Sequence, residues 1–332
     1  MKEQIQIDIV VPWVDDTDPV WRNKKAQYLG LVEDDNCCDA RYRDWDTLKY
    51  WFRSIEKNAP WVRYVFFVTD NQKPRWLNVE HPKLKWVKHT DYIPKEYLPT
   101  FNSSTIIWNL NRIEELSECF VLFNDDVFLI DKTEPEDFFV DGKPCDLPDI
   151  GTLYPTNFFS HIIFNNICLI NRHFSFKESI KKNRKLFTKY QGIGGRLKLL
   201  LYGRNDLIPG SNAYHIQSSL LKSVFDTLWE KEYDTVHQTC LNKVRAITDV
   251  TDWTVRDWTL FEGNFHPHKP LGRTFDTSTL KYSNEAIDYM KNKKGKVICL
   301  NDTEEETDFE VHKKMIIDEF EKMFPEKSSF EL

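Results

Sequence analysis

Acidic residues follow three apolar runs that have the length and composition of buried strands. The runs, each with the residues after it, are Ile5–Trp13 before Asp15, Val65–Thr69 before Asp70, and Cys119–Phe123 before Asn124, Asp125 and Asp126. Ligands of open α/β sheets bind beyond the carboxyl ends of the strands, so these acids would converge on one crevice. Adjacent carboxylates suit a Mg²⁺ or Mn²⁺ ion that clamps a diphosphate, because hard cations prefer oxygen ligands.

Each of these acids also has a purely structural interpretation. The composition of residues 15–19 favours a turn and a helix cap, and an Asp-Asp pair after a strand is often only a loop. The convergence of several strand ends favours the functional interpretation of these acids over the structural one. From the residues alone, the prediction stops at a metal-dependent enzyme that acts on a nucleotide or a phosphate.

Two more residues are candidates for proton transfer and phosphate binding. His215 follows Pro209-Gly210 and opens a helix-like stretch, so it is either a general base or a histidine at a helix start. Arg245 either forms an ion pair with Asp249 or binds a phosphate through two parallel hydrogen bonds.

The stretch Lys181–Arg204 contains eight basic residues and no acidic one, in a chain of net charge -7. Its composition fits an ordinary solvated face. It equally fits a surface that holds an anionic phosphodiester acceptor or contacts an anionic membrane leaflet.

The elements that must position these residues alternate between strands and helices in the first half. Leu84–Val87 is a fourth strand candidate, and Leu48, Trp51, Phe52 and Ile55 form a helical stripe. A second helix is expected after a cap at Ser103 or Ser104, with the stripe Ile106, Leu110, Ile113 and Leu116. The pattern predicts an α/β fold whose mainly parallel, Rossmann-like sheet is flanked by helices.

The second half is predicted to be more helical. Helices are expected over Ser218–Trp229 and Phe309–Phe324, and a short strand over Val297–Leu300. No repeat or low-complexity linker is present, and a boundary near residue 150 is the expected division.

Bulk properties exclude several classes of protein. The net charge of -7 argues against a general nucleic-acid binder, whose footprint would be basic. No run approaches the roughly 20 apolar residues that span a bilayer, and no secretory signal precedes the first strand. The seven cysteines include no C-x-x-C pair, so we expect reduced thiols, no zinc site and a cytoplasmic protein, with peripheral contact to the inner face of the membrane as an option.

Four blocks of sequence resemble the Stealth family of sugar-phosphate transferases. They are residues 7–19, residues 41–127, His215 with residues 243–249, and residues 299–302 with 323–325 and 329–331. The family contains bacterial capsule and exopolysaccharide hexose-1-phosphate transferases and the catalytic subunit of the lysosomal-enzyme N-acetylglucosamine-1-phosphotransferase. The resemblance implies a single catalytic domain, with 1–150 as the nucleotide-sugar and metal half and 151–332 as the acceptor and catalytic-base half.

The resemblance also implies the reaction. A UDP-hexose or UDP-N-acetylhexosamine would donate sugar-1-phosphate to a hydroxyl of an oligosaccharide or polysaccharide acceptor, free or lipid-linked, with release of UMP. His215 would be the general base, and Asp125, Asp126 and Asp302 would hold Mg²⁺ or Mn²⁺. Arg245 would neutralise phosphate oxygens. The remaining donor-site residues would be Asp15, Arg53, Asp70, Asn102, Arg112, Asn124, Asp249 and Asn301.

The chain departs from the family pattern in two places. Asp16 stands where a glycine is usual, and Ile107, Asn109 and Asn111 stand where the family often has an acid and histidines, which leaves Arg112 on that helix. Two alternatives stay open, a metal-dependent glycosyltransferase that releases UDP and a sugar-binding module without catalysis. Analysis of the nucleotide product separates all three.

Overall fold

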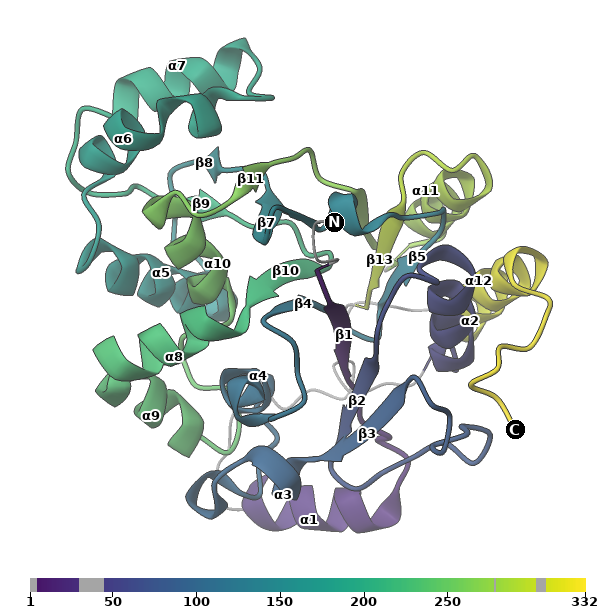
Figure 1. Ribbon diagram of the computed structural model, residues 1–332. Coiled ribbons are helices and arrows are strands. Elements are labelled where there is room, and N and C mark those ends of the chain that lie inside the picture. Colours follow the sequence, from purple (N-terminus) through teal and green to yellow (C-terminus); the bar gives the residue numbers. More distant parts are fainter. Residues whose placement is uncertain (1–4, 30–44, 278, 303–308) are drawn as a thin grey trace.

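A five-stranded sheet in the order β10-β4-β1-β2-β3 lies at the centre of the computed structural model, which describes residues 5–29, 45–277, 279–302 and 309–332 (Figure 1). Four strands are parallel: β1 (Ile7–Pro12), β2 (Val65–Thr69), β3 (Leu84–Lys88) and β4 (Cys119–Leu122). All four were predicted from the sequence, three of them from apolar runs, and the predictions are confirmed. The start of the second sequence block, residues 41–44, lies outside the described residues.

Asp8, the one acidic residue inside β1, finds its hydrogen-bond partners at the end of the sheet opposite the predicted site. Asp8 is fully buried and accepts hydrogen bonds from the Arg63 guanidinium (2.5 and 2.8 Å) and from the Ser117 backbone N–H (2.8 Å). A buried carboxylate needs such partners, because removing it from water unpaired is costly. Asp8 therefore interrupts the apolar pattern of the strand without interrupting the strand.

Two sequence predictions for neighbouring elements were wrong. The edge strand β10 (Ser218–Leu221) occupies the start of the predicted helix 218–229, because pairing with β4 holds these residues extended, and helix α8 begins only at Lys222 and ends at Lys231. Helix α4 (Ser103–Trp108) is shorter than its stripe suggested and gives way to a 3₁₀ turn over Leu110–Arg112. Its cap is Asn102, which accepts from the Ser104 N–H.

Helices cover the sheet. The first half contributes α1 (Pro19–Leu29), α2 (Leu48–Asn58) and α3 (His89–Tyr92). The second half contributes α5 (Phe158–Asn171), α6 (Phe176–Thr188), α7 (Ile193–Tyr202), α9 (Tyr233–Leu241), α10 (Trp253–Glu262), α11 (Leu280–Lys291) and α12 (Phe309–Met323). This half is the more helical one, as predicted. None of the helices in the described ranges is long and apolar enough to cross a bilayer.

Three small sheets complete the fold. One is β12-β13-β5, formed by Gly272–Asp276, Val297–Asn301 and Val127–Leu129. The others are β11-β7-β6 (His266–Pro267, Lys143–Asp146, Phe139–Val140) and β8-β9 (Asp149–Ile150, Ser211–Asn212). Each sheet of the described residues contains strands from both before and after residue 150. The sheets therefore do not divide these residues into two units at that position.

Candidate active site

The acidic turn 124–126 lies at a corner between two sheets. It follows β4 of the central sheet and leads directly into β5, which pairs antiparallel with β13. The Leu300 N–H donates to the Asp126 carbonyl (2.9 Å), which fixes β13 beside the turn. The corner therefore brings the strand-end acids next to Asn301 and Asp302, which end and follow β13.

Asp126, His215 and Cys299 form a tight cluster at this corner. One ligand-type atom from each lies within 4.8 Å of the others. The Cys299 thiol donates to Asp126 Oδ2 (3.4 Å), while the buried Asp126 Oδ1 has no hydrogen-bond partner among the described residues. Burial raises the pKa of the Asp126 carboxyl, and the charge of His215 opposes this rise. A buried carboxylate oxygen without a partner fits a role as metal ligand.

Cys299 acts as a donor in this cluster. Burial, together with the charge of Asp126, raises the pKa of its thiol well above the usual range, so the sulfur keeps its proton. The sequence assigned Cys299 no role because it sits inside an apolar strand run. The pairing of β5 with β13, which the sequence does not reveal, brings this thiol to Asp126.

His215 lies in a bend between β9 and β10, and the prediction that it opens a helix was wrong. The helix-dipole argument for a neutral ring therefore does not apply. Two contacts orient the residue instead. His215 Nε2 lies 3.0 Å from Asn124 Nδ2, and the His215 carbonyl accepts from the Thr274 hydroxyl of β12 (2.6 Å).

Asp252 joins the site from the residue before α10. Its carboxyl interacts electrostatically with both His215 and Arg245; burial raises its pKa to about 6, and the interactions with these two residues oppose the rise. Asp252 is not among the residues predicted from the sequence. It links the predicted base to the predicted phosphate-binding arginine.

Arg245, Asn102 and Asp249 come together, as their shared prediction implied. Asn102 Nδ2 donates to Asp249 Oδ2 (2.7 Å), and Arg245 Nη2 donates to the Ser103 hydroxyl (2.8 Å). The Arg245 guanidinium lies 5.5 Å from the ring centre of Phe159. Burial raises the pKa of Asp249, which also accepts from Asn242 Nδ2 and the Ala246 N–H. This buried network holds the start of α4 against the Arg245 loop.

Asp15 and Asp70 lie at the carboxyl edge of the sheet, where they were predicted. Asp15 Oδ1 accepts from the Thr17 N–H (2.9 Å) and hydroxyl (2.6 Å), so it shapes its own turn. Asp70 pairs with Lys24 of α1 (2.5 Å). Gln72 connects the two loops. Its Oε1 accepts from the Asp15 N–H (3.0 Å), and its Nε2 donates to the Asp15 carbonyl (2.8 Å).

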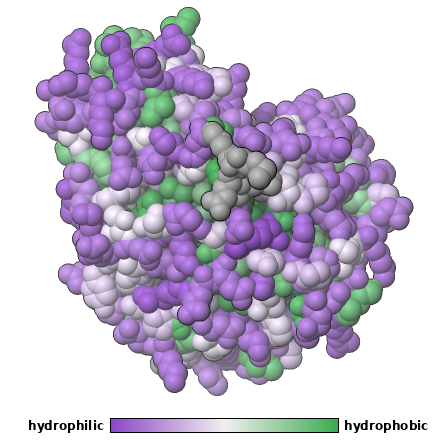
Figure 2. Space-filling model, viewed as in Figure 1, coloured by the Kyte–Doolittle hydropathy of each residue, from purple (hydrophilic) through white to green (hydrophobic). Residues whose placement is uncertain are grey.

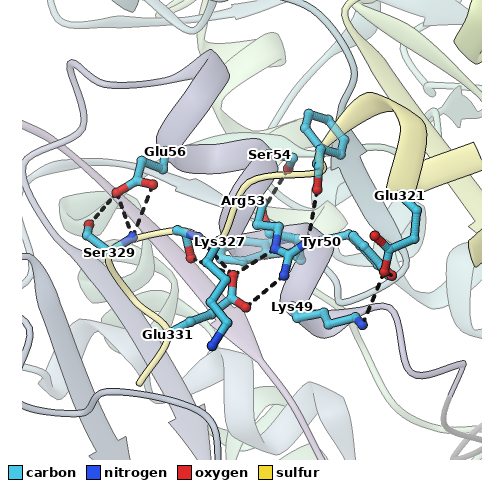
Figure 3. A network of polar contacts seen from close by, with 12 residues as sticks. Lys49, Tyr50, Arg53, Ser54, Glu56, Glu321, Lys327, Ser329 and Glu331 are labelled. Carbon is cyan, nitrogen blue, oxygen red and sulfur yellow. Dashed lines mark hydrogen bonds and ion pairs between the residues drawn. The ribbon is translucent and has the colours of Figure 1, made fainter.

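Arg53 and Arg112 are not gathered with these residues. The Arg53 guanidinium of α2 donates to both oxygens of Glu331 (2.7 and 2.9 Å) and to the Phe324 carbonyl (2.9 Å), as Figure 3 shows. Arg112 bonds Asn109 Oδ1 (2.9 Å) and stacks on Trp229 of α8 (5.1 Å). Both arginines contact other elements of the protein in this way, and their role at a donor site stays a prediction.

Comparisons with known proteins match three of the four sequence blocks; the block of His215 and residues 243–249 lies outside the matched ranges. Three family models match: Stealth protein CR1, conserved region 1, over residues 6–32; Stealth protein CR2, conserved region 2, over 41–146; and Stealth protein CR4, conserved region 4, over 289–332. His215, Arg245 and Asp252 lie between the matched ranges.

Similar curated proteins align over nearly the whole chain. Capsular polysaccharide phosphotransferase WcwK of Streptococcus pneumoniae is 42% identical over 100% of this chain and 99% of its own length. Receptor polysaccharide phosphotransferase WefC of Streptococcus gordonii is 38% identical over 98% and 99%. Exopolysaccharide phosphotransferase cps2G of Lactiplantibacillus plantarum is 34% identical over 98% and 96%. Among solved structures, the bifunctional glycosyltransferase WbbM aligns with a TM-score of 0.36 and 10% identity, covering 98% of this chain and 51% of that one.

Proposed function

This chain belongs to the Stealth family of phosphotransferases, and from that premise we propose that it transfers hexose-1-phosphate or N-acetylhexosamine-1-phosphate from a UDP-sugar to a sugar hydroxyl. UMP leaves, and a phosphodiester forms in a capsular or other cell-surface polysaccharide. Relatives named as polysaccharide phosphotransferases support an enzyme over a sugar-binding module. The observation that carries the proposal is the cluster in which His215 meets the acidic corner beside Asp126.

In the proposed reaction, the acceptor oxygen bonds to the β-phosphorus, and the bond from that phosphorus to the bridging oxygen breaks. UMP departs with the bridging oxygen and its electron pair, and the acceptor proton passes to His215. Positioning and charge neutralisation supply most of the catalysis in such transfers. Arg245 would neutralise phosphate oxygens, and the carboxyl of Asp252 interacts electrostatically with both Arg245 and His215.

Asn124 sets which nitrogen of His215 takes the proton. An asparagine amide can turn either its oxygen or its nitrogen to a partner. In the structure Asn124 Nδ2 lies 3.0 Å from Nε2; with the amide turned so that its oxygen faces Nε2, as the proposal requires, Nε2–H donates and Nδ1 is left as the proton acceptor. Asn124 is therefore a positioning residue in this proposal.

Mg²⁺ or Mn²⁺ fits the corner. Asp126 would hold it through Oδ1, Asp125 and Asp302 are the other ligands that the sequence predicts, and the ion would neutralise charge on the diphosphate. Cys299 would then support Asp126 through Oδ2 without ligating the metal. An oxygen donor set of this kind favours a hard cation.

A pocket next to His215 suits the acceptor. Tyr214 and Ile216, on either side of His215 in the chain, line a shallow depression together with Asp146 and Arg256. Arg256 is buried and held by Asp146 (2.7 Å), so it gives the pocket a rigid polar wall. Hydroxyl-rich ligands need such fixed polar groups.

The nucleotide product tests the proposed reaction. With a UDP-sugar and an acceptor, we expect UMP to accumulate in step with a phosphodiester product, measured by chromatography and ³¹P NMR. His215→Gln should lower the rate about 10²–10⁴-fold without changing the nucleotide released. Stoichiometric UDP would overturn the proposal in favour of a glycosyltransferase.

A further inference from the structure

Helices α6 and α7 project from the body of the molecule (upper left in Figure 1) and carry a dense positive charge. The cations are Lys181, Lys182, Arg184, Lys185, Lys189, Arg196, Lys198 and Arg204. All eight side chains are exposed, and none is ion-paired with a carboxylate of the described chain. We call the segment 181–204 the basic arm. Its charge is opposite to the net charge of -7 of the chain.

An apolar stripe on α7 faces solvent. Ile193, Leu197, Leu200 and Leu201 follow the spacing of one helical face, and their exposed fractions are 91%, 53%, 59% and 61%. Leu199 is the buried residue of this helix. The apolar stripe of a surface helix normally faces the protein core. The stripe of α7 faces solvent instead, which is not expected of a helix that packs only against its own protein.

Figure 2 shows hydrophobic residues among hydrophilic ones on this same projection. Large exposed apolar residues rimmed by charges mark sites of interaction with proteins or membranes. A second copy of the same face is a poor occupant, because it would bring two sets of eight cations together. An anionic lipid leaflet matches both properties at once, since its headgroups attract the cations and its acyl boundary takes up the aliphatic side chains.

We propose that the basic arm docks the enzyme on an anionic membrane surface, with the stripe of α7 inserted at the acyl boundary and the cations on the headgroups. Tyr190, half exposed in the turn between α6 and α7, suits the headgroup level. This inference concerns where the enzyme works and goes beyond the proposed reaction.

The arm connects physically to the site. The Tyr202 hydroxyl bonds the Thr152 hydroxyl (3.0 Å), and Gln191 Nε2 donates to the Pro148 carbonyl (2.5 Å). These contacts hold α7 against the β8–β9 ladder, and β9 ends only three residues before His215. If the proposed function holds, docking places a lipid-linked acceptor on the side of the molecule that carries the base.

Vesicle flotation of the full chain tests the docking. We expect binding to vesicles of equal parts phosphatidylglycerol and phosphatidylcholine, no binding to pure phosphatidylcholine, and loss of binding at high salt. Substituting Lys182, Lys185, Arg196 and Lys198 by glutamine should weaken binding about tenfold or more. Substituting Leu197, Leu200 and Leu201 by serine should do the same while leaving the cations in place.

Matched controls separate docking from general surface effects. Val20→Ser with Leu280→Ser removes exposed aliphatic residues elsewhere, and Lys281, Lys314 and Lys322 changed to glutamine removes exposed charges elsewhere; both should bind as the parent does. Circular dichroism verifies that each variant is folded, and no substrate is needed, so failure of the reaction leaves this test intact. Equal binding by parent and stripe variant, or a concentration-dependent dimer that the stripe variant loses, would overturn the proposal.

Discussion

At the scale of single residues, the unpaired oxygen of Asp126 points to the most specific chemistry of the site. A buried carboxylate oxygen without a donor costs free energy unless a cation or water satisfies it. Its partner oxygen already accepts from Cys299. Asp126 Oδ2 thus bonds to the protein, and Oδ1, which has no partner among the described residues, is available to the ion that we propose.

Asp126→Asn should therefore abolish the stabilisation of the enzyme by Mn²⁺. A ligand that binds only the native state raises the unfolding free energy by about 2.7 kcal/mol at a hundredfold excess over Kd. We expect the parent's melting temperature to rise with Mn²⁺ and that of the variant to stay fixed, in a thermal melt without substrate. Asp288→Asn, on the exposed face of α11, is the control and should respond like the parent. An unchanged Mn²⁺ response in Asp126→Asn would remove this residue from the metal site.

Asp252 should make the protein less stable above pH 6. Burial raises its pKa from 3.8 to about 6, so between these values the native state binds more protons than the unfolded state. The unfolding free energy then falls as pH rises through this window and stays low above it. Asp252→Asn should raise stability by about 1–3 kcal/mol at pH 7 and have little effect near pH 4.

Urea denaturation at the two pH values checks this prediction. The same variant should lose turnover, because it removes the negative charge that interacts with both His215 and Arg245. A variant that is less stable than the parent at pH 7 would show that the carboxylate of Asp252 is held by favourable contacts.

At the scale of elements, the chain's last residues fasten onto α2. The buried Arg53–Glu331 pair is bidentate, and Glu56 of the same helix accepts from the Ser329 N–H (3.1 Å), as Figure 3 shows. Tyr50 of α2 stacks on Phe320 of α12. Together these contacts lock α12 and the tail against the helix that covers the central sheet.

Glu331→Gln should accordingly destabilise the fold by about 3–5 kcal/mol, because it leaves the Arg53 charge buried without its partner. Lys49→Gln, which removes a partly exposed pair with Glu321 (3.5 Å), should cost less than about 1 kcal/mol. Denaturant titration measures both. The kcat of folded Glu331→Gln should match that of the parent, and a large drop in kcat would return Arg53 to the donor site.

The elements also show which predictions a sequence supports. Runs such as Val65–Thr69 are apolar on both faces, and this pattern persists in a buried parallel strand, so the four strands were predictable. Ser218–Leu221 was not, because its extended form depends on pairing with β4, which is distant in sequence. Cys299 and Asp252 could not be predicted as site residues for the same reason. Strand pairing and helix placement, which local patterns do not encode, bring them to Asp126 and His215.

At the scale of the whole molecule, the two halves of the chain complete each other. β10 from the second half covers the edge of β4, and β13 from the second half pairs with β5 from the first. The candidate site is divided in the same way, with Asn124 and Asp126 on one side and His215, Asp252 and Cys299 on the other. The predicted division of function near residue 150 would therefore be a division of side chains, because strands of the two halves pair with each other.

Neither half should fold alone. A fragment 1–150 would expose the unpaired edges of β4 and β5 and the apolar face of α2, and exposed edges and apolar faces of this kind promote aggregation. We expect fragments 1–150 and 151–332 to be insoluble when expressed singly and to co-purify as a soluble complex when expressed together. Circular dichroism and size-exclusion chromatography measure the outcome. A soluble, cooperatively unfolding fragment 1–150 would instead identify an independent nucleotide-sugar domain, and β10 and β13 would then be additions to a sheet that is stable without them.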